Sequence, residues 1–169
     1  MQNARDTFYV TLRDRLAALN PARTMVLRGV TRPGVLVEEN ELASTTEPVD
    51  VFCLRWTGLN VDAKAALPLV TMICEIQYAT DGSSGNGGMD RGRLLSAMDG
   101  ELVGAVSGAP QNTVKMNYSA AAGGGGAPVA MATNVFWGDA VFGATVVNGE
   151  RLERVATVEV FSYQEAGEL

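Results

Sequence analysis

The sequence predicts an α+β fold in which a single mainly antiparallel sheet carries two principal helices packed on one face. Three observations favour this class: a helical apolar period at the N-terminus, a second one after a clear strand near the middle, and two-residue apolar alternation elsewhere. Helices and strands do not alternate as repeated βαβ units, which favours antiparallel pairing. The length of 169 residues predicts a single domain spanning residues 1–169.

The N-terminal segment is predicted to be an amphipathic helix that ends at Asn20-Pro21, because a proline disfavours helical conformation in the residue before it. Two short β-type runs follow at residues 25–30 and 34–37. The turn signal Arg32-Pro33-Gly34 lies between them and predicts a hairpin. Residues 38–50 have the polar composition of a solvated loop. The apolar stripe of the helix consists of Ala4, Phe8, Leu12, Leu16 and Leu19.

Residues 51–56 and 70–78 are the two clearest strands, because both are rich in β-branched and aromatic residues. In the second strand, apolar side chains alternate with the polar Thr71, Glu75 and Gln77. We therefore expect one buried face and one polar face that is available to solvent or to a partner. The residues expected on the buried face are Val70, Met72, Cys74, Ile76 and Tyr78.

A glycine-rich stretch at residues 81–88 leads into a predicted helix over residues 91–106, with Asp90 as its N-cap. A second small-residue stretch at 117–128, which contains four consecutive glycines at 123–126, predicts an extended loop. Strands are expected at residues 134–142 and 152–163, with an Asn-Gly turn at 148–149 between them. The apolar stripe of the helix consists of Leu94, Leu95, Met98, Leu102, Ala105 and Val106.

Composition excludes several classes of function. A net charge of −6 with only two lysines gives no basic surface for a phosphate backbone, so nucleic acid is not expected as the principal partner. Histidine is absent, which excludes most familiar arrangements for general acid–base catalysis and transition-metal binding. No apolar window approaches the roughly 18 residues that span a bilayer. Neither a signal peptide nor a membrane anchor is therefore expected.

The two cysteines each lie in an apolar run. Cys53 and Cys74 are therefore predicted to be buried thiols of a reducing compartment, and the alternative is a disulfide between neighbouring strands.

The glycine-rich loop invites comparison with phosphate-binding loops, which present backbone N–H groups at a helix N-terminus. Residues 85–90 lack the Gly-Lys-Ser/Thr ending of a P-loop and the third glycine of the dinucleotide motif, and Asp90 adds a negative charge there. Ser83 and Ser84 do not match a nucleophile elbow. Asp81, Asp90 and Asp99 serve as well in a helix cap and a solvated surface as in a metal site. We expect no catalytic, cofactor or metal site, and no enzyme. A small-ligand or nucleotide-binding module using residues 82–88 is the alternative of another class.

The side of the 91–106 helix opposite its apolar stripe carries small residues, with Arg93 nearby. Each interior glycine costs a helix roughly 1 kcal/mol relative to alanine, so the glycines indicate either close packing or an early helix end at Gly104 or Gly108. If packing is the reason, this face meets a neighbouring subunit or loop. The small residues are Ser96, Gly100, Gly104 and Ser107.

Residues 74–80, the glycine-rich turn and residues 90–99 together resemble the tail terminator (tail completion) proteins of bacteriophages. The resemblance extends loosely over most of the chain. An N-terminal amphipathic helix, a hairpin, strands on either side of a central helix and a closing antiparallel pair are similar to that family's layout.

The resemblance implies a non-catalytic subunit of a ring, typically hexameric, that caps the head-proximal end of the tail tube and joins it to the neck connector. The implied partners are further copies of the chain, the tail tube protein, the sheath protein of a contractile tail, and the connector. Genome DNA would pass through the channel without specific binding, and no membrane is involved. The implied location is the virion tail or neck, with assembly in the host cytoplasm. Another head–tail joining or tube-associated structural protein is the alternative.

The expected subunit or partner interface includes Asp90, Arg91 and Arg93, from the resemblance, and Gly100 and Gly104, from the small-residue face. Arg91 or Arg93 is expected to pair with an acidic group, either across a subunit boundary or within the chain, at Glu75 or Asp99.

Overall fold

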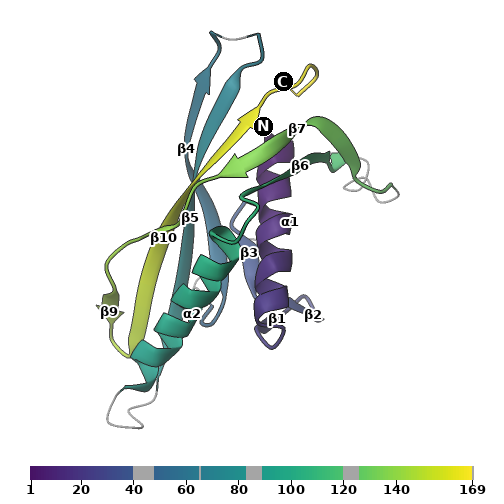
Figure 1. Cartoon of the computed structure of the whole chain (residues 1–169). Coiled ribbons are helices and arrows are strands. Elements are labelled where there is room, and N and C mark those ends of the chain that lie inside the picture. Colours follow the sequence, from purple (N-terminus) through teal and green to yellow (C-terminus); the bar gives the residue numbers. More distant parts are fainter. Residues whose placement is uncertain (40–47, 65, 83–88, 120–125, 169) are drawn as a thin grey trace.

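Two helices lie on one side of a strongly twisted sheet in the computed structural model of the chain (Figure 1). The predicted α+β class, with a mainly antiparallel sheet and both helices on one face, is therefore confirmed. The structure describes residues 1–39, 48–64, 66–82, 89–119 and 126–168.

The main sheet has the strand order β3-β4-β5-β10-β7-β6, and two short strands, β8 and β9, also pair with β10. A separate two-stranded sheet is formed by β1 and β2. Only the β3–β4 pair is parallel within this arrangement of the described strands. The elements are α1 (Gln2–Leu19), β1 (Thr24–Leu27), β2 (Val30–Pro33), β3 (Val35–Val37), β4 (Phe52–Asp62), β5 (Leu69–Asp81), α2 (Asp90–Val106), β6 (Asn112–Asn117), β7 (Val129–Trp137), β8 (Val141–Phe142), β9 (Val146–Asn148) and β10 (Arg151–Tyr163).

The centre of the sheet is the antiparallel pair of β5 and β10, whose 13 residues each are in register along their whole length. Alternate side chains of both strands point under the helices and are buried, as the two-residue period predicts. On β5 these are the five residues expected from the sequence, Val70, Met72, Cys74, Ile76 and Tyr78, and on β10 they are Ala156, Val158, Val160 and Ser162.

Helix α1 buries Ala4, Phe8, Leu12 and Leu16 against the sheet, and it ends at the predicted Asn20. Leu19, the last residue of the predicted stripe, is instead exposed to solvent at the helix end.

Helix α2 begins one residue earlier than predicted. Met89 is its N-cap and Asp90 is its first helical residue, so the predicted role of Asp90 as N-cap is wrong. Its carboxylate lies in the first turn, where the helix dipole favours a negative charge. Leu94, expected in the apolar stripe, is largely exposed, whereas Leu95 and Met98 are buried.

The first hairpin turns earlier than the sequence suggested. Arg28 and Gly29 both have positive φ, +50° and +80°, and join β1 to β2 in a two-residue turn, so the predicted turn at residues 32–34 is wrong. The run that was assigned to the second hairpin strand is β3, which instead pairs in parallel with β4. Its valines are buried in the core, and this tertiary burial outweighs the local turn signal of Pro33-Gly34.

The C-terminal half contains more strands than predicted. β6 was missed because it is short and its one buried residue is Lys115, whereas the apolar Val114 is exposed, and only its pairing with β7 reveals it. The strand expected at residues 134–142 is shifted, because β7 spans Val129–Trp137 and the chain then leaves the ladder at Gly138. The turn predicted within residues 147–150 is confirmed between β9 and β10, but its two central residues are Gly149, at a φ of +58°, and Glu150, because Asn148 pairs with Arg151. Most of both glycine-rich stretches, at residues 83–88 and 120–125, lies outside the described residues.

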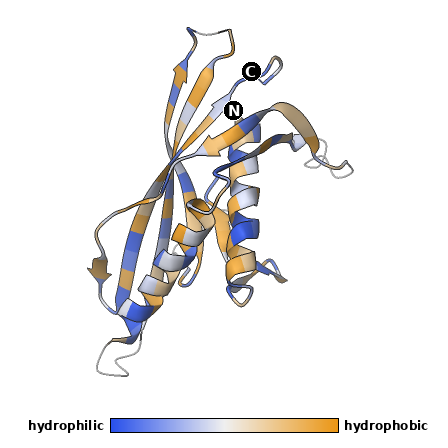
Figure 2. Cartoon of the chain, in the orientation of Figure 1, coloured by the Kyte–Doolittle hydropathy of each residue, from blue (hydrophilic) through white to orange (hydrophobic). Residues whose placement is uncertain are grey.

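The β4–β5 hairpin extends past the helices at the upper end of the molecule (Figure 1), and apolar segments occur along it (Figure 2). A β-bulge between Trp56 and Gly58 interrupts its register. Gly58 lies directly opposite Ile73, and a Cβ atom placed on Gly58 would be 2.8 Å from Ile73 Cγ1. A side chain at this position would therefore displace Ile73.

Gly58→Ala is expected to lower the free energy of unfolding by about 1–3 kcal/mol, because Ile73 must shift to admit the new methyl group. Urea unfolding followed by circular dichroism measures the effect. Gly138→Ala is the matched control, since a Cβ at Gly138 meets nothing within 4 Å, and it should change stability by less than about 0.5 kcal/mol. Equal stability of the two variants would contradict this account of the bulge.

Candidate functional site

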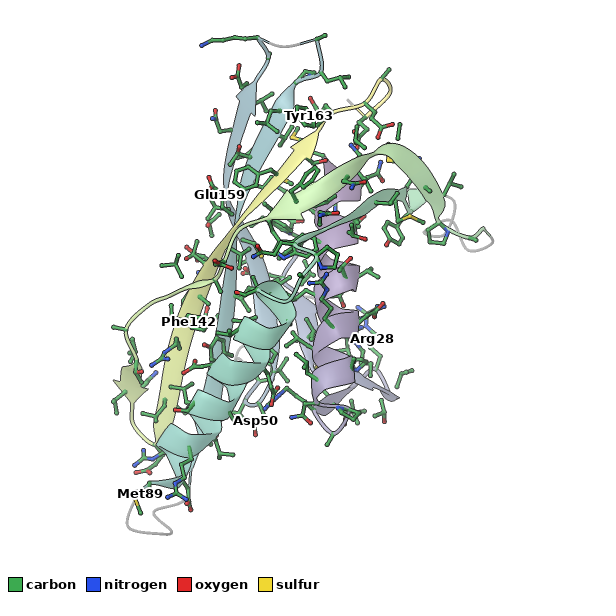
Figure 3. The ribbon with its side chains drawn as sticks, in the orientation of Figure 1. Arg28, Asp50, Met89, Phe142, Glu159 and Tyr163 are labelled. Atoms are coloured by element: carbon green, nitrogen blue, oxygen red, sulfur yellow. The ribbon has the colours of Figure 1, made fainter. Side chains whose placement is uncertain are left out.

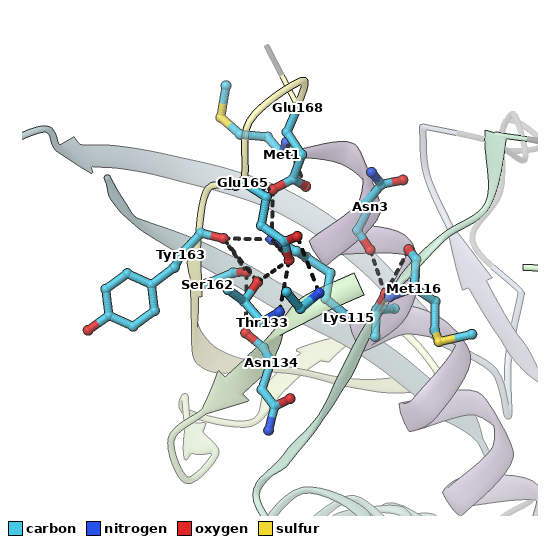
Figure 4. A network of polar contacts seen from close by, with 12 residues as sticks. Met1, Asn3, Lys115, Met116, Thr133, Asn134, Ser162, Tyr163, Glu165 and Glu168 are labelled. Carbon is cyan, nitrogen blue, oxygen red and sulfur yellow. Dashed lines mark hydrogen bonds and ion pairs between the residues drawn. The ribbon is translucent and has the colours of Figure 1, made fainter. Parts of the chain in front are cut away.

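A buried lysine joins the C-terminal segment to the sheet (Figure 4). Lys115, on β6, is fully buried, and its ammonium donates hydrogen bonds to the Tyr163 carbonyl at 2.5 Å and to Glu168 Oε2 at 2.7 Å. Glu165 lies 3.7 Å from the same nitrogen and accepts a hydrogen bond from the Thr133 hydroxyl. The network holds residues after β10 against β6 and β7, and the one ammonium of Lys115 is shared by two carboxylates.

The two carboxylates of this network have lowered pKa values. Burial of Glu168 opposes ionisation, but the backbone N–H of Glu165 and the ammonium of Lys115 outweigh it and lower the pKa of Glu168. The Thr133 hydroxyl is the main cause of the lowered pKa of Glu165. Both groups are therefore ionised at neutral pH, and they stabilise the fold without offering a general acid or base near pH 7.

A second polar cluster fixes α2 to the sheet. Asp99 accepts hydrogen bonds of 2.5 Å from both the Tyr78 hydroxyl and Arg154 Nη1. Burial, followed by the hydrogen bond to Asp99, raises the pKa of the Tyr78 hydroxyl far above its ordinary value. The phenol therefore stays protonated as a structural donor.

The residues predicted to form an interface lie in different environments in the structure. The Arg91 side chain lies across Gly82 and donates a hydrogen bond of 3.0 Å to the Glu150 carbonyl, with an ion pair of 3.3 Å to the Glu150 carboxylate. Arg91 thus pairs within the chain, but with neither of the acids that we expected, since Glu75 pairs with Arg55 and Asp99 with Arg154.

Arg93 is exposed on the outer side of α2, and its side chain makes no hydrogen bond or ion pair with the described residues. Asp90 is half-buried in the first turn of the helix. The structure therefore separates two arginines that are neighbours in the sequence: Arg91 stabilises the fold, whereas Arg93 is open to a partner.

The two glycines of α2 also differ. A Cβ on Gly100 would meet open space, whereas one on Gly104 would be 3.1 Å from Leu19 Cδ1 of α1. The helix runs through both glycines to Val106, with Ser107 as its C-cap. The alternative of a helix end at Gly104 is therefore wrong, whereas an end at Gly108 agrees with the observed C-cap to within one residue. Gly104 allows close packing within the chain, and Gly100 remains uncovered.

The described part of the chain holds no group of three or more His, Cys, Asp or Glu residues placed to bind a metal ion. Asp81 lies 3.5 Å from Arg151 in an ion pair, and Asp99 is engaged as described above. No helix among the described residues is long and apolar enough to span a membrane.

Cys53 and Cys74, both within the described ranges, form no disulfide. Cys74 is fully buried, and this burial raises the pKa of its thiol, as predicted for an inert core residue. Cys53 lies opposite Gln77 on the other side of the sheet and is only partly buried, so the prediction of a buried thiol is wrong for Cys53.

The side of the sheet that faces away from the helices, here called the open face, carries aromatic and aliphatic side chains. Phe161 on β10 lies directly opposite Phe136 on β7, and Phe136 and Tyr163 are 40% and 42% exposed. Glu159 lies on β10 (Figure 3), opposite Ile73 of β5. Its carboxylate is exposed and makes no side-chain hydrogen bond or ion pair within the described structure. The sequence predicted a polar face on β5 and placed Phe161 on the side of β10 that alternates with Val158 and Val160, but it did not predict the register that brings Phe136 of β7 opposite Phe161.

No protein-family model matches the chain, and no curated protein matches it. Among solved structures, the chain is similar to one described as "Virion of native gene transfer agent (GTA) particle". The two are 13% identical, the match covers 92% of this chain and 94% of that one, and the TM-score is 0.34. A likeness of this degree does not by itself assign a fold or a role.

Lys115→Met is expected to lower the free energy of unfolding by about 3 kcal/mol, because Glu168 would remain buried without its cation. The exposed Lys64→Met is the matched control and should have an effect below about 0.5 kcal/mol. Urea unfolding at pH 7 measures both.

Lowering the pH should remove the stabilisation that the ionised Glu165 and Glu168 provide around Lys115. The folded-state pKa values of Glu165 and Glu168 lie below the reference value of 4.5, so their contribution is present above about pH 4.5 and is lost as the pH falls through the folded values. Unfolding measured between pH 7 and pH 3 should therefore show a smaller loss of stability in Lys115→Met than in wild type. Parallel curves for the two proteins would refute the assigned role of Lys115.

Proposed function

We propose that the chain is a structural protein of a virion, and specifically a tail terminator. In this role it forms a ring, typically hexameric, that caps the head-proximal end of a phage tail tube and joins it to the neck connector. Support for the specific role comes from the resemblance of residues 74–80 and 90–99 to that family. Another head–tail joining or tube-associated protein is the nearest alternative, since such proteins also act by self-assembly.

The observation that carries the proposal is the sheet covered by helices on one face only. Its open face exposes aromatic side chains, and contiguous exposed apolar surface on a soluble protein marks an interaction site. A layered fold is completed when such a face is packed against another element, which a neighbouring subunit supplies. The polar groups around Lys115 and Asp99 are engaged in contacts within the chain. The surface that remains is therefore available for assembly.

The remaining features are compatible with a ring around DNA. The net charge of −6 suits a channel lining that does not grip the passing strand. The tail tube protein, the connector and, in a contractile tail, the sheath protein are the partners of the proposed ring. The protein would be located in the tail or neck of the virion.

Purified protein is expected to form a cyclic oligomer, and antibody labelling of particles should place it between the tail tube and the head. Native mass spectrometry counts the subunits, and electron microscopy of labelled particles locates them. A protein that stays monomeric at all accessible concentrations and is absent from virions would refute the proposal. Labelling elsewhere along the tail would favour the alternative.

Small ligands are expected to leave the melting temperature unchanged. At Gly82, the first residue of the loop at residues 82–88, the Arg91 side chain occupies the adjacent space, since a Cβ on Gly82 would collide with Arg91 Cγ. Residues 83–88 lie outside the described structure. A thermal-shift panel of nucleotides and divalent metals tests this expectation. A reproducible, saturable stabilisation by one compound would instead support a ligand-binding module.

A further inference from the structure

Most charged side chains in the described structure are paired within the chain. On the open face, Arg55 lies 3.0 Å from Glu75, whereas Glu159 has no such partner among the described residues. On α2, Arg91 is paired with Glu150, whereas the guanidinium of Arg93 makes no polar contact with the described residues. The open face and the outer side of α2 thus each present a charge that the described chain leaves unpaired, and the two charges have opposite signs.

We propose that the open face of one copy is covered by the outer side of α2 of the next copy, with Arg93 of α2 paired to Glu159 of the sheet. This inference rests on the proposed function, because it identifies the contact that builds the ring.

The apolar parts of the two surfaces also match. Met89 and Val103, which share the outer side of α2 with Arg93, are 56% and 45% exposed. Gly100 between them has open space above it, so a neighbouring sheet can approach the helix closely. On the open face, Ile73 lies opposite Glu159, and Phe161 is two residues along the same strand. Glu159 therefore has apolar neighbours along and across the strand, and Met89 lies one helical turn before Arg93. Such apolar neighbours exclude water from a contact, and pairing across an interface is then stronger than in water.

The size of the surrounding surface favours Arg93 of α2 as the partner of Glu159 over the other cationic side chains that the described structure leaves unpaired. A helix of 17 residues is about 25 Å long, which is a large part of the roughly 43 Å of a 13-residue strand. Arg28 lies on the two-residue turn of the β1–β2 hairpin, and Lys64 on the end of the β4–β5 hairpin. Neither offers the roughly 800 Å² per partner that a stable interface buries.

The arrangement of the layers decides the symmetry. The helices and the open face lie on opposite sides of the sheet (Figure 1), so the contact joins two different surfaces of identical subunits. Such a heterologous contact repeats from copy to copy and produces a closed ring when the rotation between subunits allows it.

Charge reversal tests the pairing. Arg93→Glu and Glu159→Arg should each weaken self-association by about tenfold or more, measured by sedimentation equilibrium and native mass spectrometry. The double variant should regain wild-type association to within about threefold. Arg28→Glu, which reverses another exposed arginine without a polar contact in the described structure, is the matched control and should assemble as wild type does.

Mixing the two single variants gives a sharper result. The carboxylate introduced by Arg93→Glu in one variant would face the guanidinium introduced by Glu159→Arg in the other. The second variant keeps its native Arg93, which would face the native Glu159 of the first. Alternating rings should therefore form in the mixture only. Circular dichroism of each variant should match wild type, since both side chains are exposed.

Single variants that assemble normally, or a mixture that fails to associate, would overturn this contact while leaving a ring of wild-type subunits intact. A wild-type chain that is monomeric would overturn the contact, and its absence from virions would also overturn the proposed function.

Discussion

The antiparallel ladder between β5 and β10 supports every other part of the structure. Its 13-residue register fixes which side chains point toward the helices, and both α1 and α2 pack on that same set. The remaining strands attach to its two sides, β4 to β5 and β7, β8 and β9 to β10. A slip of one residue would move the buried valines of β10 to the open face and remove the surface on which both helices rest.

Internal ion pairs complete the fold at its margins. Lys115 holds the C-terminal segment, Asp99 joins α2 to β5 and β10 through Tyr78 and Arg154, and Arg91 holds the turn before β10. These groups hold one another in place, and the perturbed pKa values of Tyr78 and Glu168 favour the protonation states that the contacts need. Their chemistry is therefore structural, which agrees with an assembly role and with a sequence that lacks histidine.

The fact that helices cover only one face of the sheet connects the fold to the proposed role. One face is closed by helices, whereas the other exposes Phe136 and Tyr163, with Phe161 between them, around a Glu159 that the described chain leaves unpaired. On the outer side of the helical layer, the side chain of Arg93 makes no polar contact with the described residues. The subunit therefore presents two surfaces of opposite charge. Self-association through different surfaces is the simplest way for it to cover its apolar residues.

The sequence by itself determined the elements whose signal is local. The helical stripe of α1, the alternation in β5 and β10, and the turn within residues 147–150 were all predictable, because side-chain periodicity and backbone preference act within a few residues. Tertiary structure alone decided the strand β6, the parallel pairing of β3, the partner of Arg91 and the exposure of Arg93. Each of these depends on a segment far away in the chain, and neither composition nor spacing records which distant residue will supply the hydrogen bond, the opposite charge or the covering side chain.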